Sequence, residues 1–435
     1  MTEIHAFDPD GTPSPGAQTA LNTATEGLAT EAHVAQAVDD ATDGLATEAQ
    51  VEAVDTRTRT YRAGAENVFA GDEAGEAGDP DATSASAGSA GGYENVFVGG
   101  QAGKTNGRGW KNTAVGTFAM RDNVDGYFNV AVGNSALERN EGGVGDAPKD
   151  DNDPGARNTA VGSNALRYNE TGRANVAIGR NSAHSSISGS YITAVGTNAY
   201  SGVVNGDTHS AKSADEVTAV GWGAAFYTDA PKSTAVGTRA LYQSVDPESY
   251  GGTAVGNRAL ENSEARENTG IGNEAGAKVT TGRWNLAVGA RALGAGSPGV
   301  TGNSNMAIGT APMQQVTSGQ YNVAVGQEAL NPIKTGSYNT AVGHQATMSA
   351  AEGTTGGTAI GASSNCSHTN SVALGRNTVT SAGDQLAIGR RHIEIGKAYG
   401  APAAPSAGVR LWAEGDGAGT KLKAIFPDGR VATIA

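Results

Sequence analysis

Apolar residues recur along most of the chain in a short pattern that returns about every 17 positions. The pattern is Asn-(Thr/Val)-Ala-(Val/Ile)-Gly, as in the run from Asn129 to Gly133. The residue three positions before the glycine is Thr, Val, Leu or Met in every copy, and the residue directly before it is Val, Ile or Leu in all but the first. These two positions share one face of a strand and are predicted to face inward. The intervening residue, usually Ala, is predicted to face outward.

The repeat predicts a β-solenoid rather than a globular core. The interval of 17 residues shortens to 14 in the last two copies, and a second apolar residue, such as Leu137 or Leu166, stands four positions after the glycine. Units this short cannot bury a face alone and must stack on one another. About 18 coils spaced by roughly 4.8 Å would form a rod on the order of 85 Å long. The glycines that end the copies are Gly71, Gly99, Gly116, Gly133, Gly162, Gly179, Gly196, Gly221, Gly237, Gly256, Gly272, Gly289, Gly309, Gly326, Gly343, Gly361, Gly375 and Gly389.

Two further columns of the repeat have structural interpretations. Asparagine stands four residues before the glycine in eleven copies, among them Asn112 and Asn129. This position predicts an Asn ladder or a left-handed turn residue rather than a binding site. The alanine column is predicted to be a close-approach face, through which such thin coils associate laterally.

Composition and charge narrow the class of protein further. The chain of 435 residues contains 64 glycines and only 5% aromatic residues, which suits a narrow core repeated many times. Its net charge is -14 and no dense Lys/Arg run is found, so nucleic acid and anionic membranes are not expected partners. The sequence has no run of 18 apolar residues, so no membrane-spanning helix is predicted. Its acidic first residues do not resemble a signal peptide. Cys366 is the only cysteine.

The repeats resemble two related groups of bacterial and viral proteins. The blocks 129–137 and 370–375 are similar to the YadA-like head repeats of trimeric autotransporter adhesins, and the 17-residue repeat resembles repeats of bacteriophage tail fibres. The resemblance covers residues 63–392. It implies a left-handed parallel β-roll that assembles as a homotrimer. An autotransporter adhesin would need a signal peptide and a C-terminal anchor barrel, and neither is recognised, so the phage tail fibre is favoured.

The two ends of the chain support this choice. The unit Gly-Leu-Ala-Thr-Glu-Ala begins at residue 27 and again at residue 44, with Thr30 and Thr47 as good helix N-caps. It resembles short helical stretches near the attachment end of fibres. At the other end, runs at 409–414, 420–426 and 430–434 alternate with period two and predict a β-meander that resembles phage tail tips. The predicted divisions are an attachment segment at 1–23, a helical stalk at 24–62, the β-roll at 63–392, a linker at 393–408 and the meander at 409–435.

Catalysis and cofactor binding find little support. The seven histidines are scattered, and the pair in Cys366-Ser-His368 is expected to lie in a solvated turn rather than to form a metal or nucleophile site. Gly270, Gly272 and Gly276 lie in register with the repeat and are not a phosphate loop. No carboxylate pair stands out for glycan cleavage. We therefore expect no enzyme, metal or cofactor.

Binding is expected where the period breaks, because loops on a rigid scaffold carry function. Insertions fall at about 72–92, 138–157, 201–216 and 243–251. The acidic insertion is expected to be solvated rather than to bind a cation; its aspartates are Asp146, Asp150, Asp151 and Asp153. Among the aromatic residues, Tyr200 is expected in the core and Trp110, Trp284, Tyr321 and Tyr338 in structural ladders. Trp222 and Tyr227 are left as the candidate receptor contacts.

The sequence thus predicts a structural and adhesion protein of a phage or phage-like tail. The N-terminus would join tail or baseplate proteins, and the homotrimer would contact a glycan or protein on the bacterial surface, with no nucleic acid partner and no membrane insertion. Its location would be the virion tail. The alternatives are an exported cell-surface adhesin and a glycan-cleaving tailspike. An ice-binding solenoid is rejected because the threonine column is predicted to face inward.

Overall fold

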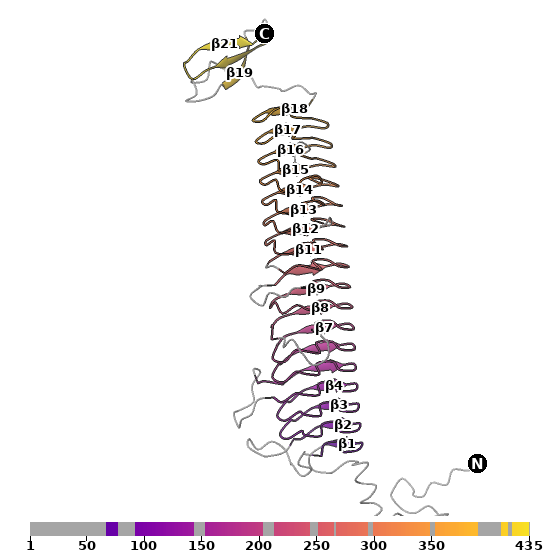
Figure 1. Cartoon of the computed structure of the whole chain (residues 1–435). Helices are drawn as coiled ribbons and strands as arrows, with labels where there is room; N and C mark the ends of the chain where they lie inside the picture. Colours follow the sequence, from indigo (N-terminus) through magenta and orange to yellow (C-terminus); the bar gives the residue numbers. More distant parts are fainter. Residues whose placement is uncertain are drawn as a thin grey trace, which may run out of the picture. The chain divides into compact units, whose positions relative to one another are not determined.

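The computed structural model describes residues 67–76, 92–142, 153–202, 213–243, 251–264, 267–294, 299–348, 353–389, 410–415 and 420–434. These residues form an all-β protein whose main part is a parallel β-solenoid of about 18 coils (Figure 1). They contain no helix. The predicted attachment segment at 1–23, the helical stalk at 24–62 and the linker at 393–408 lie outside the described residues.

Each coil contributes one three-residue strand that ends directly before the motif glycine. The solenoid strands are β1 Val68–Ala70, β2 Val96–Val98, β3 Thr113–Val115, β4 Val130–Val132, β5 Thr159–Val161, β6 Val176–Ile178, β7 Thr193–Val195, β8 Thr218–Val220, β9 Thr234–Val236, β10 Thr253–Val255, β11 Thr269–Ile271, β12 Leu286–Val288, β13 Met306–Ile308, β14 Val323–Val325, β15 Thr340–Val342, β16 Thr358–Ile360, β17 Val372–Leu374 and β18 Leu386–Ile388. The predicted position of the strands within the repeat is therefore confirmed.

The coils stack in register within each of two compact units. The first unit extends to Ser304 and contains β1–β12, and the second begins at Asn305 and contains β13–β18. Equivalent positions pair in parallel, as Val130 with Thr159 and Ala131 with Ala160. Because the pairing is in register, every column of the sequence repeat becomes a column of side chains along the stack.

The two faces of the strands are the reverse of those predicted. The middle residue, such as Ala131, is fully buried, whereas its neighbours Val130 and Val132 are 37% and 38% exposed. Alternation correctly predicted that the two flanking positions share a face, but the assignment of that face to the core is wrong. A coil this thin has little space inside, so the small side chain points inward and the β-branched pair points outward. The alanine column is therefore not a contact face on the surface.

Large core residues come from the second apolar position, as predicted. Leu137, Leu166 and Tyr200 are fully buried, opposite the small strand residues. The first coils reverse the sizes: Phe97 replaces the inward Ala, and Gly103 stands at the position of the large residue. A Cβ at Gly103 would lie 2.4 Å from the Phe97 ring, so the exchange keeps the filled volume of the coil roughly constant.

Every regular coil turns through residues in the left-handed backbone conformation. In the coil of Gly133 these are Phe128, Ser135 and Leu137, with φ values of 55°, 52° and 51°. A left-handed residue other than glycine costs about 1 kcal/mol. The left-handed conformation is needed because each turn must close within a few residues. It also keeps the backbone in register with the next coil.

Two buried ladders of asparagine join the coils. In the predicted ladder, the Asn129 Oδ1 accepts a 2.8 Å hydrogen bond from the Asn158 backbone N–H, and the Asn129 Nδ2 donates to the Gly155 carbonyl at 2.8 Å. Asn123 belongs to a second ladder in the return segment, where its Nδ2 donates to the Asn106 Oδ1 at 2.6 Å. This second ladder was not predicted, although asparagine three residues before a glycine recurs there as its signal.

The C-terminal residues form a separate three-stranded antiparallel sheet. Its strands are β19 Arg410–Gly415, β20 Thr420–Ile425 and β21 Val431–Ile434, paired in that order. The predicted meander is confirmed. Ala424 and Ile425 are its buried residues among the side chains that the structure describes.

The glycine that ends each strand should be the least replaceable residue of a coil. A Cβ at Gly99, whose φ is 131°, would lie 2.6 Å from the Gly116 carbonyl carbon, whereas a Cβ at Gly100 would meet nothing closer than 3.9 Å. We expect Gly99→Ala to destabilise its coil by roughly 2 kcal/mol or more through backbone strain. Gly100→Ala is the matched control and should be nearly neutral. Hydrogen exchange of the β2 and β3 amides measures both; equal exchange in the two variants would contradict the steric account.

The Asn ladder should contribute measurably to stability. Asn129→Ala leaves the Asn158 N–H buried without its acceptor, at a cost of about 2 kcal/mol. Asn134→Ala removes only an exposed 3.3 Å bond to the Thr117 carbonyl and should change stability by less than about 0.5 kcal/mol. Faster exchange of the Asn158 amide in the first variant alone is the expected result. If both variants exchange at the wild-type rate, the ladder is not stabilising.

Candidate functional site

The outer strand face, which we define as the residues three and one positions before each motif glycine, is an exposed feature that recurs in every described coil. No charged residue occurs at these positions in any of the 18 strands. Val, Ile and Leu predominate, and five consecutive coils from Thr193 to Thr269 place Thr beside Val or Ile. Ile178 and Ile271 are 41% and 42% exposed. Within each unit, the strand pairing makes this face a continuous strip two side chains wide.

The size of this strip exceeds what isolated exposed apolar residues produce. Twelve strands in the first unit, spaced by about 4.8 Å, give a strip roughly 55 Å long and about 10 Å wide. Its area, on the order of 500 Å², is near the upper end for apolar patches on monomeric proteins. The largest apolar patch of a typical monomer has this size and is often functional. The threonine column lies in this strip, so the ground on which ice binding was rejected, an inward-facing column, is wrong.

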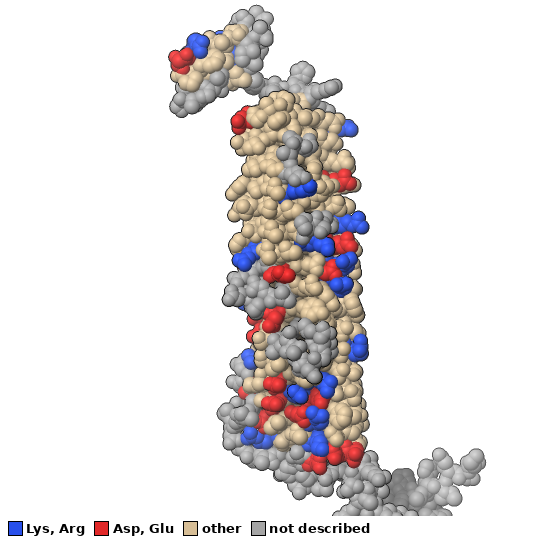
Figure 2. Space-filling model, in the orientation of Figure 1, with Lys and Arg blue, Asp and Glu red and all other residues tan. Residues whose placement is uncertain are grey.

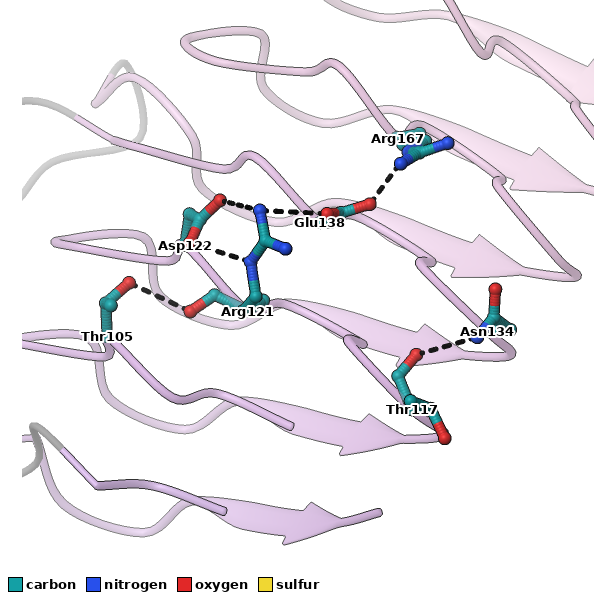
Figure 3. Close-up of polar contacts among 7 residues, drawn as sticks. All are labelled: Thr105, Thr117, Arg121, Asp122, Asn134, Glu138 and Arg167. Atoms are coloured by element: carbon teal, nitrogen blue, oxygen red, sulfur yellow. Dashed lines mark hydrogen bonds and ion pairs between the residues drawn. The ribbon is translucent and has the colours of Figure 1, made fainter. Parts of the chain in front are cut away.

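A second surface, at the turns that follow several motif glycines of the first unit, carries interleaved charges. Arg121 contacts Asp122 at 2.8 Å and Glu138 at 2.9 Å, and Glu138 also contacts Arg167 at 2.7 Å (Figure 3). Glu138 is only 4% exposed at its side chain. Figure 2 shows acidic and basic side chains gathered next to one another over the N-terminal coils. Since opposite charges alternate from coil to coil, this surface joins the coils rather than attracting an ion of one sign.

The two candidate receptor contacts lie in different surroundings. Trp222 directly follows a motif glycine and is 50% exposed. Tyr227 packs edge-on against Phe226 and Tyr242, with ring centroids 4.6 and 5.2 Å away. Partial burial and the neighbouring Tyr227 raise the pKa of the Tyr242 hydroxyl. Among the described contacts no ring contact joins Trp222 to this cluster, although a Cβ at the neighbouring Gly223 would lie 3.3 Å from the Tyr242 ring.

Several other aromatic residues form ladders, as predicted. Trp110 stacks between Tyr93 and Tyr127 at centroid distances of 5.4 and 5.0 Å. Tyr321 and Tyr338 stack at 4.9 Å. Trp284 differs, because its described partner is a carboxylate: its Nε1 donates to the Glu267 Oε2 at 2.9 Å.

The single cysteine lies in the core and not in a solvated turn. Cys366 is fully buried and its Sγ donates to the Ser371 carbonyl at 2.8 Å. The reason is register: it stands five residues after Gly361, where the shorter coil brings its small side chain inward. Of the acidic insertion, Asp153 accepts a 3.0 Å hydrogen bond from the Tyr127 hydroxyl, and Asp146, Asp150 and Asp151 lie outside the described residues. The described part holds no group of three or more His, Cys, Asp or Glu side chains placed to bind a metal.

Comparison with known protein families and with curated proteins finds no match for this chain. The described residues include no helix long and apolar enough to cross a lipid bilayer. The functional argument therefore rests on the surfaces themselves. They consist of one uncharged apolar strip, ion-paired turns and several exposed aromatic residues.

Proposed function

We propose that the protein is a structural and adhesion component of a phage or phage-like tail, a homotrimeric fibre that contacts the bacterial surface. The observation that carries the proposal is the outer strand face. An apolar strip that accompanies every coil has the form expected of a surface buried along the length of an assembly. The resemblance of the repeats to fibre and adhesin heads points to the same class.

The chemistry of the strip favours further copies of the same chain as its partner. Identical columns of Val, Ile and Thr, spaced at the strand repeat, match another such strip better than they match an irregular protein surface. Its lack of charge also fits burial, because no ionised side chain would have to be desolvated. Three strips facing one axis would cover all three apolar faces and leave the charged turns outside. The number three and the left-handed winding come from the family resemblance.

Adhesion is assigned to the surfaces that such a trimer leaves exposed. Trp222 and Tyr227 stay candidate receptor contacts, and the N-terminal residues 1–62 are proposed to join tail or baseplate proteins. The location that follows is the virion tail. The buried carboxylates Asp125, Glu138 and Glu261 each pair with arginine, a structural use that supports a non-enzymatic role.

Assembly through the strip can be tested by placing a charge in it. Ile178→Arg should prevent or strongly weaken the trimer, because three guanidinium groups would be buried at one level. Asn181→Arg, in the same coil, is the control: its column already carries Arg239 and Arg258 in other coils, so the trimer should persist. Light scattering of the purified proteins gives the mass. A wild-type monomer or dimer would contradict the proposed trimer.

The tail location has a direct test. An antibody raised against the purified protein should label the tails of virions released by the bacterium that carries the gene, as seen by immunogold electron microscopy. Labelling of the bacterial envelope without virions would instead support the exported adhesin. Pre-incubation of host cells with the wild-type protein should reduce virion adsorption.

A further inference from the structure

A column of exposed aromatic rings in the second unit ends abruptly. The ring column consists of the residues five positions before the motif glycine: Tyr321, Tyr338, Gly356, Asn370 and Asp384 in successive coils. The rings of Tyr321 and Tyr338 stack at 4.9 Å with an angle of 14° between their planes, close to the coil spacing of about 4.8 Å. They are 47% and 60% exposed. The next coil has glycine at this position, so the stack stops at Tyr338.

The backbone conformation does not require glycine at this position. Gly356 has φ 71°, but Tyr338 and Asn370 adopt φ 60° and 55° with side chains in place. The coils remain joined here, because the Gly356 N–H donates to the Ser337 carbonyl and the Asn370 N–H to the Thr355 carbonyl, each at 3.0 Å. What Gly356 changes is therefore the surface. It removes one side chain between the ring of Tyr338 and the next residue of the column.

The far side of this gap is an amide. The Asn370 Oδ1 lies 2.6 Å from the position that a Cβ of Gly356 would take, so the amide leans over the glycine. Asn370 is exposed, and its side-chain amide makes no hydrogen bond among the described contacts. The space left by the missing side chain of Gly356 is thus bordered by the ring of Tyr338 on one side and by the Asn370 amide on the other. The amide can both donate and accept hydrogen bonds.

The surroundings are polar and carry a single charge, that of Asp384. The column beside the ring column carries Ser337, Thr355 and Thr369, and the other neighbouring column carries Asn, Gly and Ser in these coils. Over residues 305–389 the only charged residues of the sequence are Glu328, Lys334, Glu352, Arg376 and Asp384. The coils near the C-terminal end accordingly show few blue or red side chains in Figure 2. The one charge of these three columns in the second unit is Asp384, which follows Asn370 in the ring column, so an anionic ligand is disfavoured there.

We propose that Tyr338, Gly356 and Asn370 bind one neutral pyranose residue of a bacterial surface glycan. The sugar ring would lie where the next aromatic ring of the column would stand. Its apolar C–H face would stack on Tyr338, and its hydroxyl groups would exchange hydrogen bonds with the Asn370 amide. This inference rests on the proposed adhesive function and specifies its receptor class and contact site.

The test uses the full-length protein with fluorescently labelled neutral oligosaccharides of glucose, galactose, mannose and N-acetylglucosamine. Binding is measured by fluorescence polarisation for the wild type, Tyr338→Ala, Gly356→Trp and Tyr191→Ala. Gly356→Trp fills the gap, and the backbone should accept it because Trp284 occupies the equivalent position of its own coil with φ 57°. The exposed Asn370 amide, whose Oδ1 lies 2.6 Å from the new Cβ, would have to turn aside. Tyr191→Ala is the matched control, an exposed tyrosine in the same register with φ 60°.

We expect the wild type and Tyr191→Ala to bind at least one of these oligosaccharides equally well. Tyr338→Ala and Gly356→Trp should each lower the affinity at least about tenfold, with light scattering and thermal melting unchanged. Absence of binding to every probe, or retained binding in Gly356→Trp, overturns the inference. One outcome would refute the sugar site alone: the antibody labels virion tails, and pre-incubation of host cells with the Tyr338→Ala protein still reduces virion adsorption. The proposed fibre function would then stand. The opposite outcome would refute the fibre function alone: the antibody labels no tails and the wild-type protein does not reduce virion adsorption, yet Tyr338→Ala and Gly356→Trp both lose oligosaccharide binding. The sugar site would then stand.

Discussion

The structure depends on one constraint: each coil must repeat the backbone of the previous coil at a distance short enough for continuous hydrogen bonding. The motif glycines show how tight this stacking is. At Gly256, a Cβ would lie 2.4 Å from the Gly272 carbonyl oxygen, a distance that no side chain tolerates. Stacking in register then imposes its own consequence. Each residue lies beside the residue at the equivalent position of the next coil, so every position of the repeat forms a column along the stack.

This constraint explains both the core and the ladders. A core of constant width accepts Ala opposite Leu, and in the first coils it accepts Phe97 opposite Gly103 because the sum of the two volumes is what matters. Polar residues can be buried for the same reason. The Asn129 side chain bonds to the Asn158 N–H and the Gly155 carbonyl of the next coil, and the Asn129 N–H donates to the Asn112 side chain of the coil before. The ladder thus satisfies backbone groups that would otherwise be unpaired in the interior.

The surfaces differ because each follows a different column. The outer strand face repeats Val, Ile and Thr and so becomes an apolar strip, which we assign to association between copies. The turns repeat charges of opposite sign, as in the contact of Glu138 with Arg121 and Arg167, which join successive coils. We assign ligand binding to positions where a column is interrupted. Gly356, which ends the stack of Tyr321 and Tyr338, is such a position, and there the regularity of the scaffold defines the size of the space that a ligand would fill.

The sequence by itself determined the repeat, the place of the strand and its glycine turn, the large core residue at Leu137 and its equivalents, the first Asn ladder and the C-terminal meander. Each of these is a local or periodic property. Only the tertiary structure decided which face of the strand is inside, since alternation shows that two faces differ but not which one the coil encloses. The narrow width of the coil made that choice, placing Ala131 inward and Val130 outward. It also decided the left-handed turns at Phe128 and Leu137, because neither residue type favours that conformation and only stacking on the next coil stabilises it.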